Sequence, residues 1–525
     1  MRIEGQIVDV IAREIFSGSI EFENGKIVAV NKHETAEKSF ILPGFVDSHD
    51  HIESSMLPPR EFARTAMRHG TLAIVADPHE IANVCGMEGV NFMMDEADLS
   101  PMKICFAVPS CVPATPFCTA GAELNAHDVK ELLADPHTYA LAEMMNFPGV
   151  INKDPEVMTK IKAAHELGKP VDGHVPLISG DGLKQYVAAG ISTDHEASNL
   201  EEAKEKIALG MKILIREGST ARNFNALHPL ITNYADSLMF CTDDMKAMDL
   251  QYGHINKIVA KAIALGYDLF DVLQIASVNP VKHYKIPMGL LQKDDAADFI
   301  ICDDLVNFVP KEVFVNGEPT QATAYATASK NMNNFKLKSF NVEQITDDLS
   351  QKEELHVMEV IDGELITPHK ILTKKDFNQV QKIVVVNRYE ENPSIGIGYI
   401  KGFDIKDGAI AQTIAHDSHH VIATGSSDEL IVKAIRELIQ LEGGIVVTDN
   451  SKTTSLALPI GGLMANDTCE NVAHAQVALM EHLKELQCPL SSPIVALAFM
   501  QLPVIPELKI TDKGLFDVTK FEFIQ

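Results

Sequence analysis

The chain has 525 residues, of which 46% are hydrophobic and 22% charged, a composition typical of a soluble globular protein with more than one domain. It carries 45 lysines and arginines against 73 aspartates and glutamates, a net charge of -28. Such acidity repels phosphate backbones and anionic lipid headgroups, which argues against nucleic acid and membrane surfaces as partners. The negative charge is compatible with a small neutral or cationic substrate. Solubility alone would explain the charge equally well.

Cysteine usage and the N-terminal segment bear on the compartment. The 8 cysteines are scattered without a CxxC pair, which is typical of reduced core thiols rather than a disulfide framework. The opening MRIEGQIVDVIAREIFSG lacks a basic stretch followed by an apolar one, as a signal peptide would have. No apolar run approaches the roughly 20 residues that cross a bilayer. We expect a cytoplasmic protein.

Residues 1–42 alternate short apolar and polar runs, GQIVDVIA and GSIEFENGKIVAV. The ENGK turn between apolar stretches predicts a hairpin. This segment is too small to fold alone. It is predicted to pair with residues 286–325, where two or more strands with a turn at Asn316-Gly317 follow one another, so that both flanks form one small β domain.

Between residues 43 and 285, short apolar runs alternate with helical stretches, which predicts a parallel α/β fold. Eight candidate strands occur, FILPGFVD, TLAIVAD, KICFAVP, TYALAEM, KPVDGH, GISTDH, MKILIREG and SLMFCTD. Eight such units predict a (β/α)8 TIM-type barrel. After it, residues 326–378 look linker-like, with the start of the next domain inside them, and residues 379–525 mix strands and helices into a C-terminal α+β domain.

Polar side chains follow nearly every candidate barrel strand. They are His49, His51, Asp77, His79, Glu143, His174, Asp194, His195, Arg216, Glu217, Asp243 and Asp244. In a barrel these strand ends converge on the face where active sites are assembled. Burying so many polar groups is costly unless they are paired or bind metal. The pattern therefore predicts an active site at this face.

His49-Asp50-His51 ends the first strand, and period-two geometry points both imidazoles to the same side. Alone, the pair could be two incidental surface histidines. The imidazoles of His174 and His195 join this pair, together with one carboxylate each from the fourth and eighth strands. The whole set of side chains suits two divalent ions of the Zn, Mn or Fe type.

Long phrases of the chain resemble the adenine deaminase family of the amidohydrolase superfamily. They include PGFVDSHDHIESSM, VADPHEIANVCG, LAEMMNFPGV, DGHVP, STDHE, CTDD and YGHIN, and beyond the barrel GAIAQTIAHDSHHVIATG and LPVIPELKITDKGL. The resemblance covers nearly the whole chain. It implies a hydrolase that deaminates adenine to hypoxanthine and ammonia in purine salvage, with two divalent ions per subunit, Mn favoured over Fe or Zn.

The resemblance also assigns residues. It implies these metal ligands: His49, His51, Glu143, His174, His195 and Asp243. Glu143 stands where many related enzymes have a carboxylated lysine. After CTDD the chain has MKAMDLQYGHIN instead of the family's run beginning Arg-His, which puts a substrate-side loop in doubt. We expect hydroxide generated at the metals to attack C6 of adenine, Asp243 to carry its proton to the leaving amine, and Glu80 or Glu53 to protonate N1.

Other positions leave alternatives open. Asp77 and His79 are expected to orient ligands or contact substrate, and His254 could do either or be structural. His416, His419 and His420 form a polar loop of the third domain, or contribute to the active-site mouth or a further metal.

Two rival functions remain. One is another amidohydrolase acting on a different heterocycle or cyclic amide, since the same ligands serve many reactions. The other is a non-catalytic metal-binding homologue, which the intact ligand set disfavours. The size of the enzyme favours a homo-oligomer, with a dimer expected.

Overall fold

A computed structural model describes residues 1–320, 329–347 and 349–524. The chain forms two compact units. The first comprises Met1–His79, Asn91–Cys111 and Leu124–Thr327, and the second comprises Glu80–Val90, Val112–Glu123 and Ala328–Gln525. The domain boundary expected at 325–326 lies outside the described residues. Among the described helices, none is both long and apolar enough to cross a bilayer.

Both flanks of the barrel contribute to one sheet of the first unit. Its strand order is β15-β14-β13-β4-β1-β2-β3. The bounds are β1 (Arg2–Asp9), β2 (Glu14–Glu23), β3 (Lys26–Lys32), β4 (Phe40–Pro43), β13 (Phe299–Cys302), β14 (Pro310–Val315) and β15 (Glu318–Pro319). The flanks meet where β4 pairs antiparallel with β13.

Two hairpin turns of this sheet lie where the sequence places them. At Asn24-Gly25 and at Asn316-Gly317, both residues of each turn have positive φ. That backbone suits the right-handed twist of the flanking strands, and asparagine and glycine adopt it readily. Apolar side chains from both flanks, including Ile20, Ile41 and Phe299, form the core under the sheet.

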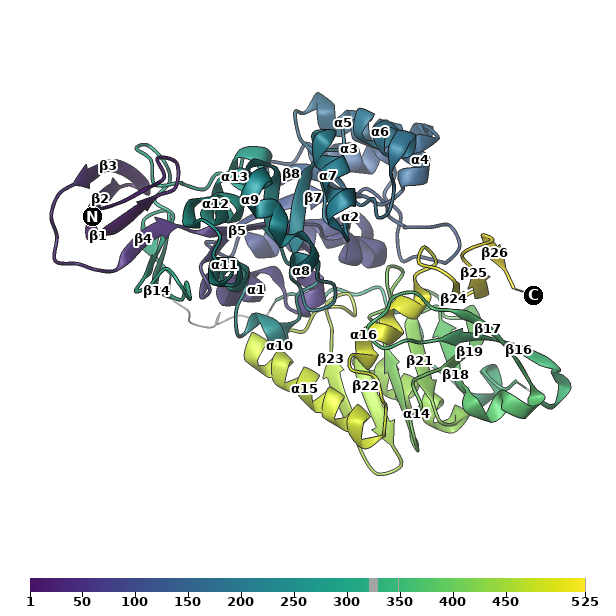
Figure 1. Cartoon of the computed structure of the whole chain (residues 1–525). Helices are drawn as coiled ribbons and strands as arrows, with labels where there is room; N and C mark the ends of the chain where they lie inside the picture. Colours follow the sequence, from purple (N-terminus) through teal and green to yellow (C-terminus); the bar gives the residue numbers. More distant parts are fainter. Residues whose placement is uncertain (321–328, 348, 525) are drawn as a thin grey trace. The chain divides into compact units, whose positions relative to one another are not determined.

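Eight parallel strands, in a sheet of five and a sheet of three, follow one another in chain order around the barrel. They are β5 (Phe45–Asp50), β6 (Thr71–Ala76), β7 (Lys103–Val108), β8 (Thr138–Met144), β9 (Val171–Gly173), β10 (Thr193–Asp194), β11 (Lys212–Arg216) and β12 (Leu238–Cys241). Figure 1 shows three of them, labelled β5, β7 and β8, among the helices of the first unit. A parallel bridge from Val171 to Ile191 joins β9 to the chain entering β10, and one from Asp50 to Asp243 joins β5 to the chain leaving β12. The expected α/β barrel is therefore confirmed.

Helices connect these strands. The longer ones are α1 (Pro59–Met67), α2 (His79–Ala97), α3 (Ala126–Leu133), α5 (Pro155–Glu166), α6 (Gly180–Ala188), α7 (Leu200–Ala208) and α11 (Ile255–Ala264). Local sequence sets their starts. Asn125 and Asp128 form a capping box before α3, and the Asp154 carboxylate accepts two backbone N–H groups at the start of α5.

The second unit is built on an eight-stranded sheet in the order β17-β16-β19-β18-β21-β20-β22-β23. Its strands are β16 (Glu354–Glu359), β17 (His369–Thr373), β18 (Gln381–Val386), β19 (Ile395–Lys401), β20 (Gly408–Gln412), β21 (Val421–Gly425), β22 (Gly444–Asp449) and β23 (Thr453–Ala457). The unit also has α14 (Asp428–Leu441), α15 (Cys469–Glu485) and a small sheet of β24 (Leu508–Thr511), β25 (Gly514–Asp517) and β26 (Glu522–Phe523).

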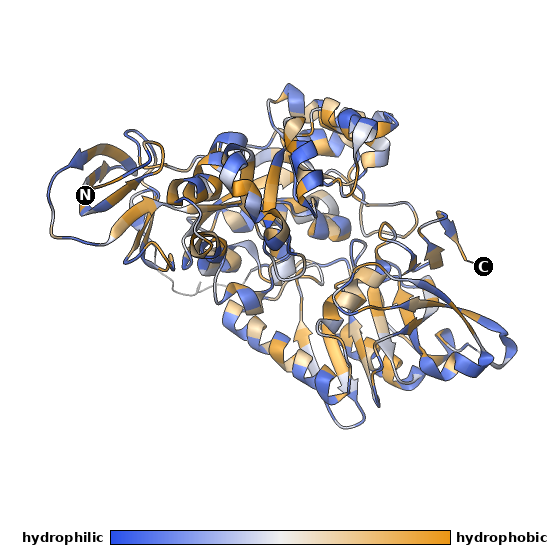
Figure 2. Cartoon of the chain, viewed as in Figure 1, coloured by the Kyte–Doolittle hydropathy of each residue, from blue (hydrophilic) through white to orange (hydrophobic). Residues whose placement is uncertain are grey.

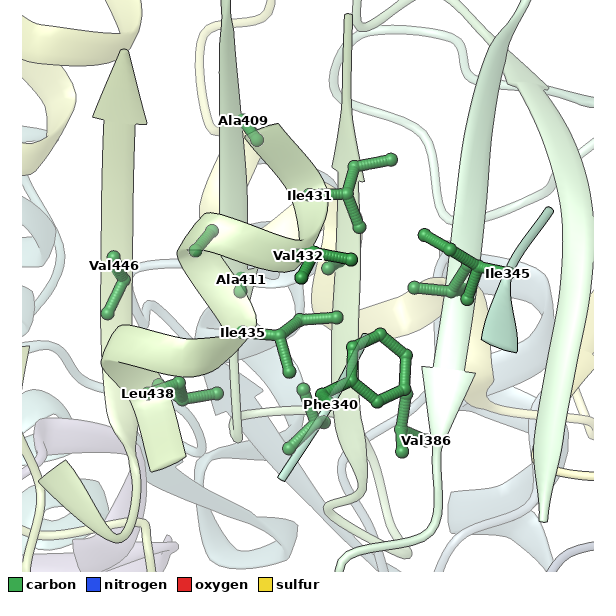
Figure 3. Close-up of a cluster of buried hydrophobic side chains, with 14 of the residues drawn as sticks. Phe340, Ile345, Val386, Ala409, Ala411, Ile431, Val432, Ile435, Leu438 and Val446 are labelled. Atoms are coloured by element: carbon green, nitrogen blue, oxygen red, sulfur yellow. The ribbon is translucent and has the colours of Figure 1, made fainter. Parts of the chain in front are cut away.

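Helix α14 presents its apolar face to this sheet. Ile431 and Ile435 of the helix lie among strand residues such as Val386 and Val446 (Figure 3). The central strands are mostly hydrophobic, whereas α15 alternates hydrophilic and hydrophobic residues, as a helix with one solvated face does (Figure 2).

Residues 329–347 and 349–378, from the segment expected to be linker-like, contribute to this unit. Phe340 and Ile345 are fully buried in the core shown in Figure 3, and β16 and β17 form one edge of the sheet. Polar residues are tolerated here because β17 is an edge strand, in which Lys370, Ile371 and Thr373 are exposed. Single apolar anchors such as Phe340 then supply the packing without a periodic signal.

Candidate metal centre

The two histidines that end β5 face the same side of the strand, as period-two geometry requires. The ring centroids of His49 and His51 are 4.8 Å apart, and both rings are buried. Their Nε2 atoms lie 4.0 and 3.4 Å from the Oε1 atom of Glu143 on β8. The first and fourth barrel strands thus bring their polar ends together.

Glu143 lies between two pairs of imidazoles. Its Oε2 atom is 2.6 Å from Nδ1 of His174 and 3.3 Å from Nε2 of His195, which follow β9 and β10. Burial acts to raise the pKa of this carboxyl, but the imidazoles, His174 foremost, hold it well below its usual value. Glu143 is therefore ionised and has one oxygen directed to each pair.

Asp243 completes the group from the chain leaving β12. Its Oδ1 atom lies 3.1 Å from Nε2 of His51 and 3.6 Å from Nε2 of His49. The backbone of Asp243 has a φ of 59°, a conformation that aspartate tolerates better than most residues. Its N–H donates to the His49 carbonyl and its own carbonyl accepts from the His51 N–H, which closes the barrel at the site.

Two further residues at the site, Arg216 and Glu196, were not predicted as site residues. Nη1 of Arg216 is 2.5 Å from Oδ2 of Asp243 and 2.5 Å from Oε1 of Glu196. Burial opposes ionisation of Asp243, but the guanidinium holds its pKa well below its usual value. The position of Arg216 at the end of the seventh strand was a usable signal, whereas Glu196 had none beyond its place beside His195.

The donor set fits divalent cations. His49 Nε2 is buried and has no hydrogen-bond partner among the described residues. Burial, followed by the neighbouring imidazoles of His195 and His51, lowers the pKa of His49 well below its usual value, so the ring is neutral and offers a lone pair. A buried lone pair beside ionised carboxylates and other imidazoles is what a borderline divalent ion requires.

Asp77 and His79 lie beside the group. The Asp77 carbonyl is 3.0 Å from Nδ1 of His51, and its carboxylate is 3.1 Å from Nδ1 of His79. The His79 ring is 4.5 Å from that of His51, and its Nδ1 atom is 3.7 Å from Glu143. The contact of the Asp77 carbonyl with Nδ1 leaves Nε2 of His51 directed into the site.

The other two predicted residues of the first unit occupy different places. Glu53 is buried in the 3-10 turn Ile52–Ser55 that follows β5. The six-residue group of the candidate metal centre consists of His49, His51, Glu143, His174, His195 and Asp243. His254 lies outside the six-residue group, with its Nδ1 atom 2.8 Å from the Thr71 hydroxyl and its Nε2 atom 3.2 Å from Asp47.

Glu80 belongs to the second unit, where it meets two histidines of the AHDSHH segment. Its Oε1 atom is 2.5 Å from Nδ1 of His416, and its Oε2 atom contacts Nε2 of His419. The next histidine, His420, is separate from this cluster and lies 3.6 Å from Asp512. The segment therefore divides between two buried polar groups.

Comparisons with known proteins agree with this architecture. The amidohydrolase family model matches residues 40–320, and the adenine deaminase C-terminal domain matches residues 355–522. The chain is 46% identical to adenine deaminase of Methanosarcina mazei, over 99% of this chain and 98% of that protein. It is also 46% identical to adenine deaminase of Sulfurovum sp., over 100% and 99%. The chain belongs to the adenine deaminase family of the amidohydrolases.

Proposed function

We propose that the chain hydrolyses adenine to hypoxanthine and ammonia, as an enzyme of purine salvage. Relatives named adenine deaminase match it over nearly their whole length. The observation that carries the proposal is the convergence of four imidazoles and two carboxylates at the ends of separate barrel strands. A barrel enzyme assembles its chemistry at this face.

Two divalent cations would be held by His49, His51, Glu143, His174, His195 and Asp243. When bound, such ions would lower the pKa of water to about 7, so that hydroxide is available at neutral pH. We propose Mn²⁺ rather than Fe²⁺ or Zn²⁺, because the family resemblance favours it. A cytoplasmic homodimer remains our prediction from the sequence.

Asp243 is suited to carry the proton between nucleophile and leaving group. Its carboxylate is ionised, and the Arg216 guanidinium on Oδ2 fixes its orientation. From there it accepts the proton of the attacking water and returns it to the departing amine. The adenine ring must gain a proton at N1 as negative charge builds up on it. We propose Glu53 or Glu80 as the donor of this proton.

Asp243→Asn tests this assignment. The amide keeps the shape of the side chain but cannot accept the proton, so we expect kcat for adenine to fall by roughly 10²- to 10⁴-fold. Metal content, measured by mass spectrometry, should change little. Asp236→Asn is the matched control, because Asp236 lies exposed at the opposite end of β12 and should leave kcat unchanged. Normal turnover by Asp243→Asn would refute the role.

Ammonia release from adenine, guanine and cytosine separates this proposal from its rivals. Adenine alone should be turned over well. Preference for another heterocycle would identify a different amidohydrolase, and bound metal without turnover of any base would identify a non-catalytic homologue. In the same assay, the N1 donor is the residue, Glu53 or Glu80, whose glutamine variant loses turnover while its metal content stays normal.

A further inference from the structure

A second cluster of potential metal ligands lies in the first unit, apart from the six-residue group. It consists of Asp47 and Asp50 on β5 and His254, which directly precedes α11. One ligand atom from each residue lies within 4.8 Å of the others. The exposed fractions are 0%, 0% and 1%, so bulk water does not solvate these groups.

Asp50 is the unusual member of this cluster. Neither of its carboxylate oxygens has a hydrogen-bond partner in the described part of the chain, and no ion pair to it is found there. An isolated buried carboxylate costs several kcal/mol unless a proton or a cation neutralises it. The neighbouring Asp47 carboxylate adds a second negative charge.

Asp47 and His254 are both held in place by hydrogen bonds. Oδ1 of Asp47 accepts the N–H groups of His49 (3.3 Å) and Thr242 (3.1 Å), and Oδ2 accepts the Thr242 hydroxyl (2.5 Å). Nδ1 of His254 is 2.8 Å from the Thr71 hydroxyl oxygen. If Nδ1–H donates to that oxygen, the Nε2 lone pair is free to bind a cation, which is the usual arrangement of a metal-binding histidine.

Nε2 of His254 supports this assignment. It is buried without a hydrogen bond among the residues described, although Oδ2 of Asp47 lies only 3.2 Å away. The cluster therefore offers three unsatisfied atoms, two carboxylate oxygens and one imidazole nitrogen. All three belong to residues that are at least 99% buried.

We propose that Asp47, Asp50 and His254 bind a divalent cation of their own, in addition to the ions at His49 and His51. Carboxylate oxygens with one imidazole suit Mn²⁺ or Zn²⁺. A divalent charge would balance the two aspartates. The ion would also link β5 to the start of α11 and, through Thr242, to the chain that carries Asp243.

Counting bound Mn²⁺ tests the proposal. The full-length enzyme is stripped with a chelator, reloaded with MnCl₂, desalted and analysed by mass spectrometry. Asp50→Asn keeps the side-chain shape and has no hydrogen bond to lose, so it should fold and hold one Mn²⁺ fewer per chain than wild type. Asp298→Asn is the control, because Asp298 is equally buried but accepts N–H groups from Gly289 and Asn316. Its Mn²⁺ content should match wild type.

The comparison with Asp50→Asn is informative whatever the total count is. An equal count in wild type and Asp50→Asn would overturn the proposal and show that a proton neutralises Asp50. Loss of two or more ions would overturn it too, because Asp50 would then act on the ions at His49 and His51. Should Asp50→Asn not fold, His254→Gln provides the same count. His195→Ala tests the six-residue group separately, so failure of either site can be distinguished.

Discussion

At the residue scale, Lys509 is a buried lysine that has no carboxylate partner among the residues that the structure describes. It lies on β24 with no exposed surface, and its Nζ donates to the Thr367 hydroxyl (2.6 Å) and the Leu365 carbonyl (3.0 Å). Burial lowers the pKa of Lys509 from 10.5 to about 7. Between these values the unfolded chain holds a proton that the folded chain lacks, so the free energy of unfolding rises with pH.

Lys509→Met should remove this pH dependence. The pH-dependent contribution of Lys509 to the free energy of unfolding is fully present above pH 10.5 and is lost as pH falls through about 7. By linkage it amounts to about 5 kcal/mol at most. Urea unfolding midpoints measured from pH 7 to pH 9.5 should rise for wild type and stay flatter for the variant. Parallel curves would mean that Lys509 keeps its proton in the folded state.

The six proposed ligands could be predicted from the sequence because each lies at or just beyond the end of an apolar strand of a recognisable repeat. Such a pattern does not show which side chains from different strands meet. The contact of Arg216 with Asp243 and the isolation of Asp50 both depend on strand ends that only the closed barrel brings together. Asp50 was noted only as the residue between two histidines.

At the element scale, the short strand β9 is packed tightly against the chain entering β10. A Cβ atom added at Gly173 would lie 2.3 Å from the Thr193 carbonyl oxygen and 2.9 Å from Ile191. Backbone cannot give way there without moving His174, the next residue. Glycine at this position therefore sets both the strand spacing and the position of an imidazole.

Gly173→Ala should destabilise the barrel by roughly 1–3 kcal/mol, because overpacking forces backbone shifts. Bound metal should fall with it, since His174 is displaced. Thermal unfolding and metal analysis measure both effects. Gly182→Ala is the control, because its nearest neighbour to an added Cβ is Ile178 at 3.4 Å, an ordinary contact. Unchanged stability in Gly173→Ala would show that β9 and β10 can separate at no cost.

The barrel strands were predictable because both faces are buried, which leaves near-continuous apolar runs such as β6 and β7. The strands β16 and β17 were not, since their polar, partly exposed residues resemble a linker. This segment forms strands because it pairs with strands that are distant in the sequence, and not because of its local sequence. Tertiary context overrides weak strand propensity there.

At the scale of the whole molecule, the division into units does not follow the chain. Residues 80–90 and 112–123 lie within the barrel sequence, yet they belong to the second unit. Nδ2 of Asn334 donates to the carbonyls of Val84 (3.1 Å) and Gly121 (3.2 Å). The Thr119 hydroxyl donates to Asp512 (2.7 Å). Nothing local in these short segments indicates such distant partners, so from the sequence both segments were predicted to belong to the barrel.

This division predicts that residues 1–327 do not fold alone. Without residues 328–525, the backbone carbonyls of Val84 and Gly121 lose their donor, and Phe117 loses the ring of Phe516, whose centroid is 4.4 Å away. Unsatisfied polar groups and newly exposed apolar surface both favour aggregation. We expect fragment 1–327 to be insoluble on expression, and co-expressed 328–525 to restore solubility. A soluble fragment 1–327 with a cooperative thermal transition would show that the barrel completes its own core without these partners.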